Sequence, residues 1–273
     1  MKFSLLIAHY NNHIYFKDCL KSIINQTFSD FEIVILDDFS DQDSYNSICE
    51  SIKNDSRFSI YRNDENKGVG YTKNKLIELA KGEICGFLDP DDALVPNAVE
   101  KSLDMHSKFK DCSATYSKMM MCNENLNPMY LFKRTSKIIN QDPLFVNIDT
   151  SVAHFFSFKK SKIIDFSPYI DYTLRAAVDQ DLYLKLYEKG SFIYINEPLY
   201  NYRLHSEGVS QSSNKNNAKS EFKKVIRNTL ERRNVIQLNG KDVNMLSDDE
   251  LYSSLVTREN SISMKFKKLL CRF

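Results

Sequence analysis

Three aspartates, Asp89, Asp91 and Asp92, lie within four residues directly after the apolar run at 84–88. Packed together without a counter-charge, these carboxylates would repel one another strongly. A divalent cation is the natural compensation, because Mg²⁺ and Mn²⁺ prefer oxygen ligands and share their coordination with water and phosphate groups. This Asp-x-Asp therefore indicates a site for Mn²⁺ or Mg²⁺, and a solvated acidic turn before a helix is the alternative.

Residues suited to hold a nucleotide base follow two other apolar runs. Asp38 comes after the run at 32–36, and Tyr10 comes after the first run of the chain. A carboxylate can accept a hydrogen bond from the ring N–H of uracil, and a tyrosine ring offers an aromatic face to the base. The alternative is a turn in which Asp37, Asp38 and Asp41 cap the next helix.

Two glycines, Gly68 and Gly70, allow the backbone to approach a bound ligand closely. Lys73 follows in the first turn of the helix that we expect there. Neither a G-x-x-x-x-G-K-[ST] loop nor a G-x-G-x-x-G motif occurs in the chain. A P-loop NTPase and a dinucleotide-dependent enzyme are therefore disfavoured.

The elements that must position these residues are indicated by an alternation of apolar runs with amphipathic stretches. The runs are continuous, as expected for parallel strands that are covered on both faces, and connections of this kind are nearly always right-handed. We therefore expect a doubly wound α/β sheet, whose ligands bind beyond the carboxyl ends of the strands. The four strand and helix pairs are predicted at 3–8 and 16–25, 32–36 and 45–53, 58–62 and 72–80, and 84–88 and 97–106.

The rest of the chain divides into two parts. From residue 112 to about 203 the segments are longer, with a helix predicted at 181–188 and short strands at 192–195 and 200–203, and we expect them to extend the same sheet. A polar loop is predicted at 210–217, followed by helices at 220–236 and 248–259.

Composition limits the function classes. The 273 residues contain 37 Lys+Arg and 36 Asp+Glu, so the charge balance gives no sign of a nucleic-acid partner. No apolar stretch is long enough to span a membrane, and the run at 3–8 is too short for a secretory signal, so we expect a cytoplasmic protein. The six cysteines form no C-x-x-C pair, which favours reduced thiols over disulfides or a zinc site.

Five motifs, taken in order along residues 3 to about 210, resemble those of family 2 glycosyltransferases. The resemblance implies the GT-A fold, a Rossmann-like, mostly parallel α/β sheet, and metal-dependent transfer of a sugar from a nucleotide diphosphate, most often UDP, to an acceptor hydroxyl with inversion. It predicts a transferase domain at 1–210, with a nucleotide-binding half at 1–110 and an acceptor half at 111–210, and a helical extension at 211–273. The motifs lie at residues 4–11, 22–27, 32–40, 66–68 with Asn74, and 87–92.

The resemblance also assigns roles to individual residues. The catalytic base falls on Asp179 in the segment 178–186, with Asp181 in reserve, and the alternative is that both only cap and charge a helix. The metal falls on Asp91 or Asp92, with Asp89 in the first acidic position and His205 near the metal. The nucleotide-binding residues are expected to be Ala8, Tyr10, Asp37, Asp38, Asn66, Gly68, Lys73 and Asp89.

Four residues depart from the family pattern. Val178 stands where an acid is frequent, Ala8 where proline is common, and Lys73 and Lys185 where arginine is usual. A lysine cannot reproduce the two-pronged hydrogen bonding of an arginine. None of these departures removes the expected metal site or the expected base.

The resemblance further suggests the reaction class. The family's processive synthases carry membrane spans and a Gln-x-x-Arg-Trp motif, whereas this chain has no tryptophan. We therefore expect single additions to a bacterial surface glycan such as lipopolysaccharide or capsule, on a glycan or lipid-linked glycan acceptor. The alternatives are a sugar-nucleotide pyrophosphorylase, whose glycine-rich opening is absent at residues 9–12, and an inactive sugar-nucleotide-binding scaffold.

Basic and apolar residues alternate at 262–273 in a pattern that could place them on separate faces of a helix. One interpretation is a peripheral contact with the inner face of the membrane, and the other is an ordinary terminal helix packed on the domain. The pattern leaves the oligomeric state open, because apolar positions after residue 220 fit either the domain or a partner.

Overall fold

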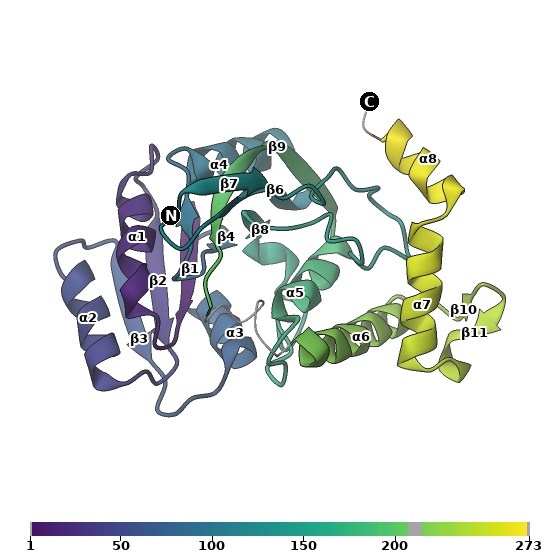
Figure 1. Cartoon of the computed structure of the whole chain (residues 1–273), viewed down its shortest axis with the longest axis horizontal. Coiled ribbons are helices and arrows are strands. Elements are labelled where there is room, and N and C mark those ends of the chain that lie inside the picture. The colour runs from purple at the N-terminus through teal and green to yellow at the C-terminus, as the bar shows by residue number, and fades with distance from the viewer. Residues whose placement is uncertain (1, 207–214, 272–273) are drawn as a thin grey trace.

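The first half of the chain forms the parallel part of one large sheet (Figure 1). The computed structural model describes residues 2–206 and 215–271. Four parallel strands stand in the order β3-β2-β1-β4, so that β1 has β2 on one side and β4 on the other. They are β1 (Phe3–His9), β2 (Glu32–Asp37), β3 (Phe58–Arg62) and β4 (Ile84–Phe87). The predicted doubly wound α/β architecture is confirmed.

Helices cover both faces of these strands. Leu5 and Ile7 of β1 pack in one apolar cluster with α1, α2 and α4, while Leu6 packs in a second cluster with α3 and α5. Because successive side chains of a strand point to opposite faces, a strand between two helical layers needs apolar residues at every position. The helices are α1 (His13–Ile24), α2 (Gln42–Ile52), α3 (Val69–Leu79), α4 (Ala98–Lys108) and α5 (Val178–Tyr187).

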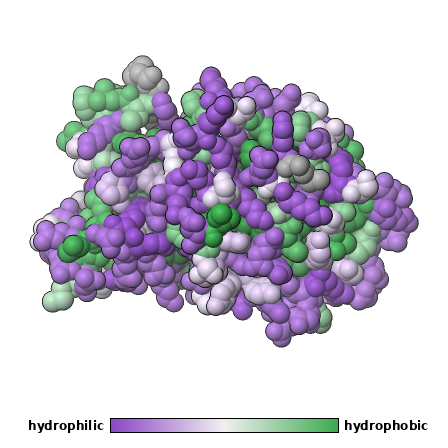
Figure 2. All heavy atoms as spheres, turned by 180° about the vertical axis from the view of Figure 1, so that it is seen from behind, coloured by the Kyte–Doolittle hydropathy of each residue, from purple (hydrophilic) through white to green (hydrophobic). Residues whose placement is uncertain are grey.

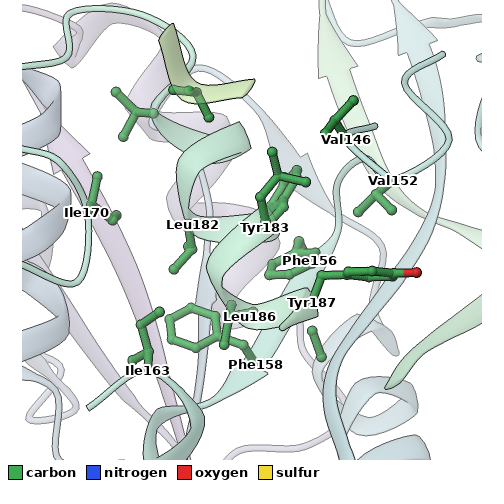
Figure 3. Close-up of a cluster of buried hydrophobic side chains, with 14 of the residues drawn as sticks. Val146, Val152, Phe156, Phe158, Ile163, Ile170, Leu182, Tyr183, Leu186 and Tyr187 are labelled. Atoms are coloured by element: carbon green, nitrogen blue, oxygen red, sulfur yellow. The ribbon is translucent and has the colours of Figure 1, made fainter. Parts of the chain in front are cut away.

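The second half of the sheet continues from β4 in the order β8-β6-β9-β5, and β7 pairs with the outer part of β6. β8 is antiparallel to both of its neighbours, whereas β6 and β9 are parallel to each other. Helix α5 covers this part, with Leu182, Tyr183 and Leu186 close to Phe156 of β8 (Figure 3). The strands are β5 (Ala93–Leu94), β6 (Cys112–Cys122), β7 (Pro128–Leu131), β8 (Phe156–Lys159) and β9 (Ser191–Arg203), and a 3₁₀ turn spans Lys160–Lys162.

The prediction of two short strands at 192–195 and 200–203 was wrong, because they belong to the single strand β9. Its pairing with β6 shifts register around Lys118, where the partner changes from Ile195 to Pro198 and then to Tyr200. A bulge of this kind accommodates a proline inside a strand and hides the regular alternation that marks a strand in a sequence.

The C-terminal part is helical and lies at the right of Figure 1, beyond the sheet. Val225, Ile226 and Leu230 of α6 are buried in the same cluster as α5. Helix α6 begins within the loop predicted at 210–217, whose residues up to 214 fall outside the described part. The elements are α6 (Lys215–Arg232), β10 (Gln237–Leu238), β11 (Lys241–Asp242), a 3₁₀ turn (Val243–Met245), α7 (Asp248–Glu259) and α8 (Ile262–Leu270). None of the described helices is both long and apolar enough to cross a bilayer.

Candidate active site

A pocket of about 630 Å³ opens beyond the carboxyl ends of β1, β2 and β4. Strand β1 lies where the strand order reverses, and in open α/β sheets such a position leaves a crevice for a ligand. The ends of the strands contribute one wall, and the N-termini of α3 and α5 contribute the other. The predicted site residues that line the pocket are Ala8, Tyr10, Asp38, Asn66, Gly68, Lys73, Asp89, Asp91, Asp92 and Asp179.

Asp38 is buried in the wall of the pocket. Its carboxylate accepts hydrogen bonds from the side-chain amide of Asn63 at 2.7 Å and from the backbone N–H groups of Lys67 and Gly68 at 2.9 and 2.8 Å. Tyr10 follows the end of the neighbouring strand β1 and is half exposed. Asp38 therefore holds the loop before α3 in place. It also lines the pocket, as does Tyr10.

Asp37 is completely buried and is not among the residues that line the pocket. Its carboxylate binds Nδ1 of His9 at 2.8 Å and accepts hydrogen bonds from the hydroxyl and the backbone N–H of Ser40. Burial alone would raise the pKa of Asp37, but these hydrogen bonds outweigh it and hold the pKa below its ordinary value. Asp37 thus positions the end of β1. The cap of α2 predicted as an alternative is made by Asp41, which accepts from the N–H of Ser44.

Gly68 occupies a conformation and a space that only glycine fits. Its φ is +86°, in the left-handed region, and a Cβ there would lie 1.5 Å from Nη1 of Arg175. That nitrogen donates a hydrogen bond to the carbonyl oxygen of Lys67 at 2.8 Å. The guanidinium of Arg175 therefore joins the loop before α3 to the segment before α5, on the wall of the pocket.

The acidic residues after β4 differ in exposure: one is buried and two are partly exposed. Asp92 is buried, and its oxygens accept from the hydroxyl of Tyr200 and from the backbone N–H of Arg203, both at 2.7 Å. Asp91 is partly exposed, and one of its oxygens lies 2.8 Å from Nε2 of His205. Asp89 is partly exposed as well. The geometry therefore favours Asp89 and Asp91 over Asp92 for contact with a ligand.

The electrostatics of this cluster suit a cation. Burial and the negative charge of Asp89 raise the pKa of Asp91, against the effect of His205, which lowers it. Burial and the charges of both neighbours raise the pKa of Asp92 further. Among the described residues, no three histidine, cysteine, aspartate or glutamate side chains form a complete metal cage. Two carboxylates fit an ion such as Mg²⁺ or Mn²⁺, which takes its other ligands from water and substrate phosphates.

His205 contacts this cluster from β9's end and is not among the residues that line the pocket. Its Nε2 faces Asp91, and its buried Nδ1 has no hydrogen-bond partner among the described residues. In this arrangement His205 holds Asp91 in position without itself lining the pocket. Its assignment as a metal ligand stays a prediction.

Asp179, the predicted base, lies in the first turn of α5 and faces Lys73 of α3. The ammonium nitrogen of Lys73 is 2.8 Å from Oδ1 of Asp179 and 3.4 Å from Oδ1 of Asp89. Burial would raise the pKa of Asp179, but Lys73 and then His154 outweigh it, and the pKa lies below its ordinary value. The carboxylate is therefore ionised and able to accept a proton at neutral pH.

Asp181, the reserve candidate, points away from the pocket. It is buried, accepts a hydrogen bond from the backbone N–H of Asp171 and pairs with the ammonium of Lys185, both at 2.8 Å. These contacts favour a structural role for Asp181, which is not among the residues that line the pocket. Val178, where the family often has an acid, is buried in the apolar core at the start of α5.

The pocket is also lined by His154 and Arg175, which were not among the predicted site residues. Nε2 of His154 lies 3.9 Å from Oδ2 of Asp179, and its ring stacks on that of Tyr200 with centroids 5.0 Å apart. The other residue, Arg175, forms the contact with Lys67 described above. Both lie in irregular segments before β8 and α5, where no periodic pattern marks a direction, so no signal in the sequence could have found them.

A different cavity, of about 750 Å³, lies away from this site beside the start of β4. Its wall mixes Lys2, Lys159, Glu83, Glu100 and Asp104. The buried imidazole of His106 also reaches it, and burial together with Lys159 lowers the pKa of that ring to about 4. The carboxyl ends of the parallel strands do not reach this cavity, so the first pocket is the candidate active site.

Comparisons with known proteins agree on one family. The family model described as "Glycosyl transferase family 2" matches residues 4–166. The chain is 32% identical to the chondroitin synthase of Escherichia coli over 213 residues, which are 76% of this chain and 29% of that protein. It is 27% identical over 221 residues to the GalNAc(5)-diNAcBac-PP-undecaprenol beta-1,3-glucosyltransferase of Campylobacter jejuni, covering 79% of this chain and 69% of that protein.

The fold is also shared with a solved structure. TarS residues 1–349 from S. aureus, in complex with UDP-GlcNAc, superimpose with a TM-score of 0.71 at 20% identity, and the match covers 96% of this chain and 73% of that one. At this identity the likeness concerns the fold alone.

Proposed function

The chain belongs to glycosyl transferase family 2, and on that premise we propose that it transfers single sugars from a UDP-sugar to the hydroxyl of a growing bacterial polysaccharide. The observation that carries the proposal is one pocket that joins three functions. The pocket is lined at one end by Asp38 and Tyr10, which we call its nucleotide end. It is also lined by the partly exposed carboxylates of Asp89 and Asp91 and by the ionised carboxylate of Asp179.

The nucleotide end suits the donor's base and ribose. Tyr10 offers its ring face, and Asp38 offers carboxylate oxygens in the wall of the pocket. Gly68 leaves the backbone open to close approach beside them. A nucleotide placed here directs its diphosphate toward Asp89 and Asp91, because these residues follow the neighbouring strand. The TarS complex, which holds UDP-GlcNAc in the same fold, supports a UDP-sugar as donor.

Asp89 and Asp91 would hold Mn²⁺ or Mg²⁺ together with the diphosphate. When bound, the ion stabilises the negative charge that develops on the departing UDP. The chain's own contribution is to keep the two carboxylates side by side. His205 orients Asp91 through a hydrogen bond, and Asp92 ties the acidic turn to β9 through Tyr200 and the backbone of Arg203.

Asp179 would act as the general base. Its carboxylate takes the proton of the acceptor hydroxyl, and the acceptor oxygen attacks the anomeric carbon from the face opposite to the leaving UDP, which inverts the configuration. Lys73 keeps Asp179 ionised and links it to Asp89 at the donor side. Nε2 of His154 lies 3.9 Å from the other oxygen of Asp179.

The acceptor is proposed from the relatives. One is named as a chondroitin synthase, and another is named for the transfer of glucose to an undecaprenol-linked glycan. We therefore assign this chain a glycan or lipid-linked glycan acceptor in surface polysaccharide synthesis, at the cytoplasmic side of the membrane where nucleotide sugars are made. The family match decides against the pyrophosphorylase alternative.

Calorimetric titration of UDP into the protein tests the donor site. We expect Mn²⁺-dependent binding by the unaltered protein and its loss in Asp91→Asn, since the variant keeps the shape of the side chain and removes its charge. Asp104→Asn, an exposed aspartate of α4, is the matched control and should bind normally. Absence of UDP binding with either metal would overturn the proposal.

A further inference from the structure

Helix α8 carries an apolar stripe that no other described part of the chain covers. Ile262, Phe266, Leu269 and Leu270 are 87, 60, 49 and 59% exposed, although they are large hydrophobic residues. At 3.6 residues per turn these four positions fall on one side of the helix. In Figure 2 α8 forms the projection at the upper left, and hydrophobic surface is visible on it.

The opposite side of α8 is fixed to the rest of the protein. Met264 is only 5% exposed. One turn later, the ammonium of Lys268 lies 2.5 Å from a carboxylate oxygen of Asp149 and also pairs with Glu259. Ser261 caps the helix by accepting from the N–H of Met264. The helix is thus held in one orientation, and its apolar stripe is directed away from the protein.

Two further lysines border the stripe. Lys265 and Lys267 are exposed and fall on its two sides, and residues 262–270 contain three lysines and no acidic residue. Such an arrangement matches the interface of an anionic bilayer, where apolar side chains enter the acyl boundary while lysines bind headgroups. A second copy of α8 is a poorer partner, because two such helices would bring lysines together without any carboxylate of α8 to pair with them.

We propose that α8 is a membrane-docking helix, which lies in the plane of an anionic lipid surface with its apolar stripe inserted and Lys265 and Lys267 on the headgroups. A single short helix supplies limited apolar area, so the contact is weak and depends on salt. This proposal goes beyond the proposed transferase activity and does not depend on it.

Co-sedimentation of the full chain with vesicles tests the proposal. We expect binding to vesicles of phosphatidylcholine with phosphatidylglycerol, little binding to phosphatidylcholine alone, and release at high salt. Lys265→Glu with Lys267→Glu should weaken binding by about twenty-fivefold or more, since each lysine near an anionic surface contributes about fivefold. Phe266→Ser should weaken it by about tenfold.

Matched controls separate the stripe from general surface effects. Lys17→Glu with Lys21→Glu changes two exposed lysines of α1 by the same charge, and Met245→Ser removes an apolar residue that is 84% exposed elsewhere in the extension. Both controls should bind vesicles as the unaltered protein does. UDP binding and circular dichroism report that each variant is folded, and Lys267→Gln replaces the double variant if that one does not fold.

Three results would overturn the proposal. One is the absence of binding to anionic vesicles, and another is unchanged binding by both stripe variants. The third is a dimer, measured by light scattering, that Phe266→Ser dissociates, because that result assigns the stripe to a second copy of the chain. If the unaltered protein does not bind UDP, that result would contradict the transferase proposal and leave the membrane proposal standing.

Discussion

The ammonium nitrogen of Lys73 lies 2.8 Å from Oδ1 of Asp179, so a buried lysine of α3 forms an ion pair with a carboxylate in the first turn of α5. The two residues are 106 positions apart in the chain. The same nitrogen reaches Asp89, which joins the proposed base to the acidic residues after β4. The pKa of Lys73 is raised, because the two carboxylates outweigh the effect of burial, and the ammonium stays charged throughout the pH range of activity.

Lys73→Met should move the acid limb of the pH profile of kcat/KM to higher pH. Asp179 is active when ionised, and its pKa is depressed mainly by Lys73 against the effect of burial. Removal of the ammonium raises that pKa, because an adjacent cation stabilises the ionised carboxylate, so activity is lost at a higher pH as pH falls. Lys73→Arg keeps the charge and should restore most of the profile. An unchanged acid limb in Lys73→Met would contradict this account.

Asp179→Asn should lower kcat by about 10²–10⁴-fold, as expected for loss of a general base. UDP binding should be retained, because the variant leaves unchanged the residues proposed to hold the donor, among them Asp38, Asp89 and Asp91. Steady-state kinetics and UDP titration check the two parts separately.

The neighbouring variant Asp181→Asn provides the contrast. Asp181 pairs with Lys185 away from the pocket, so its loss should reduce the free energy of unfolding by about 3–5 kcal/mol, as when one partner of a buried pair is removed. Activity per folded molecule should remain near normal. The assignment of the base to Asp179 fails if Asp181→Asn abolishes turnover in folded protein and Asp179→Asn does not.

Gly68→Ala should weaken UDP binding as well as stability. A backbone with φ +86° and ψ 164° costs an alanine about 1–3 kcal/mol, and the added Cβ would displace the guanidinium of Arg175. Gly240→Ala is a close control, because Gly240 has a φ of +77° and open space around its Cβ position. Both variants should lose stability in denaturant unfolding, Gly68→Ala the more, and only Gly68→Ala should lose affinity for UDP. Equal affinities would show that Arg175 does not shape the pocket.

Glu221→Ala should lower kcat/KM through the segment that carries Asp179. A carboxylate oxygen of Glu221 on α6 accepts from the backbone N–H groups of Arg175 and Ala176 at 3.0 and 2.5 Å. The next residue, Ala177, has a φ of +54°, which is costly for a residue other than glycine. Without Glu221 this segment should relax, with about tenfold lower kcat/KM and about 1–3 kcal/mol lower stability.

Rescue experiments distinguish positioning from simple destabilisation. Glu221→Gln keeps an acceptor oxygen and should restore most of kcat/KM, whereas Glu231→Ala, at an exposed position of the same helix, should have no effect. A parallel loss in both alanine variants would remove the positioning role from Glu221.

Much of the first half could be predicted from the sequence. The continuous apolar runs at β1, β2 and β4 mark strands buried on both faces, and the polar residues after them mark one edge of the sheet. These signals suffice to bring Asp38, Asp89 and Asp91 to one pocket, because the carboxyl ends of neighbouring parallel strands meet there.

The remaining features depend on contacts that leave no local pattern. Asp37 is the last residue of β2 and Asp38 is the first residue after it. The side chain of Asp37 turns into the protein toward His9, and only the packing there decides which of the two lines the pocket. His154 and Arg175 reach the pocket from irregular segments. The bulge in β9 likewise comes from its pairing with β6 and cannot be read from β9 alone.

The central claim is most directly tested by UDP release from UDP-sugars, measured for the unaltered protein, Asp91→Asn and Asp179→Asn, with Mn²⁺ and with a chelator. We predict metal-dependent release by the unaltered protein and strong loss in both variants, with UDP binding kept only in Asp179→Asn. Release that persists in both variants, or that is the same with the chelator, would contradict the account.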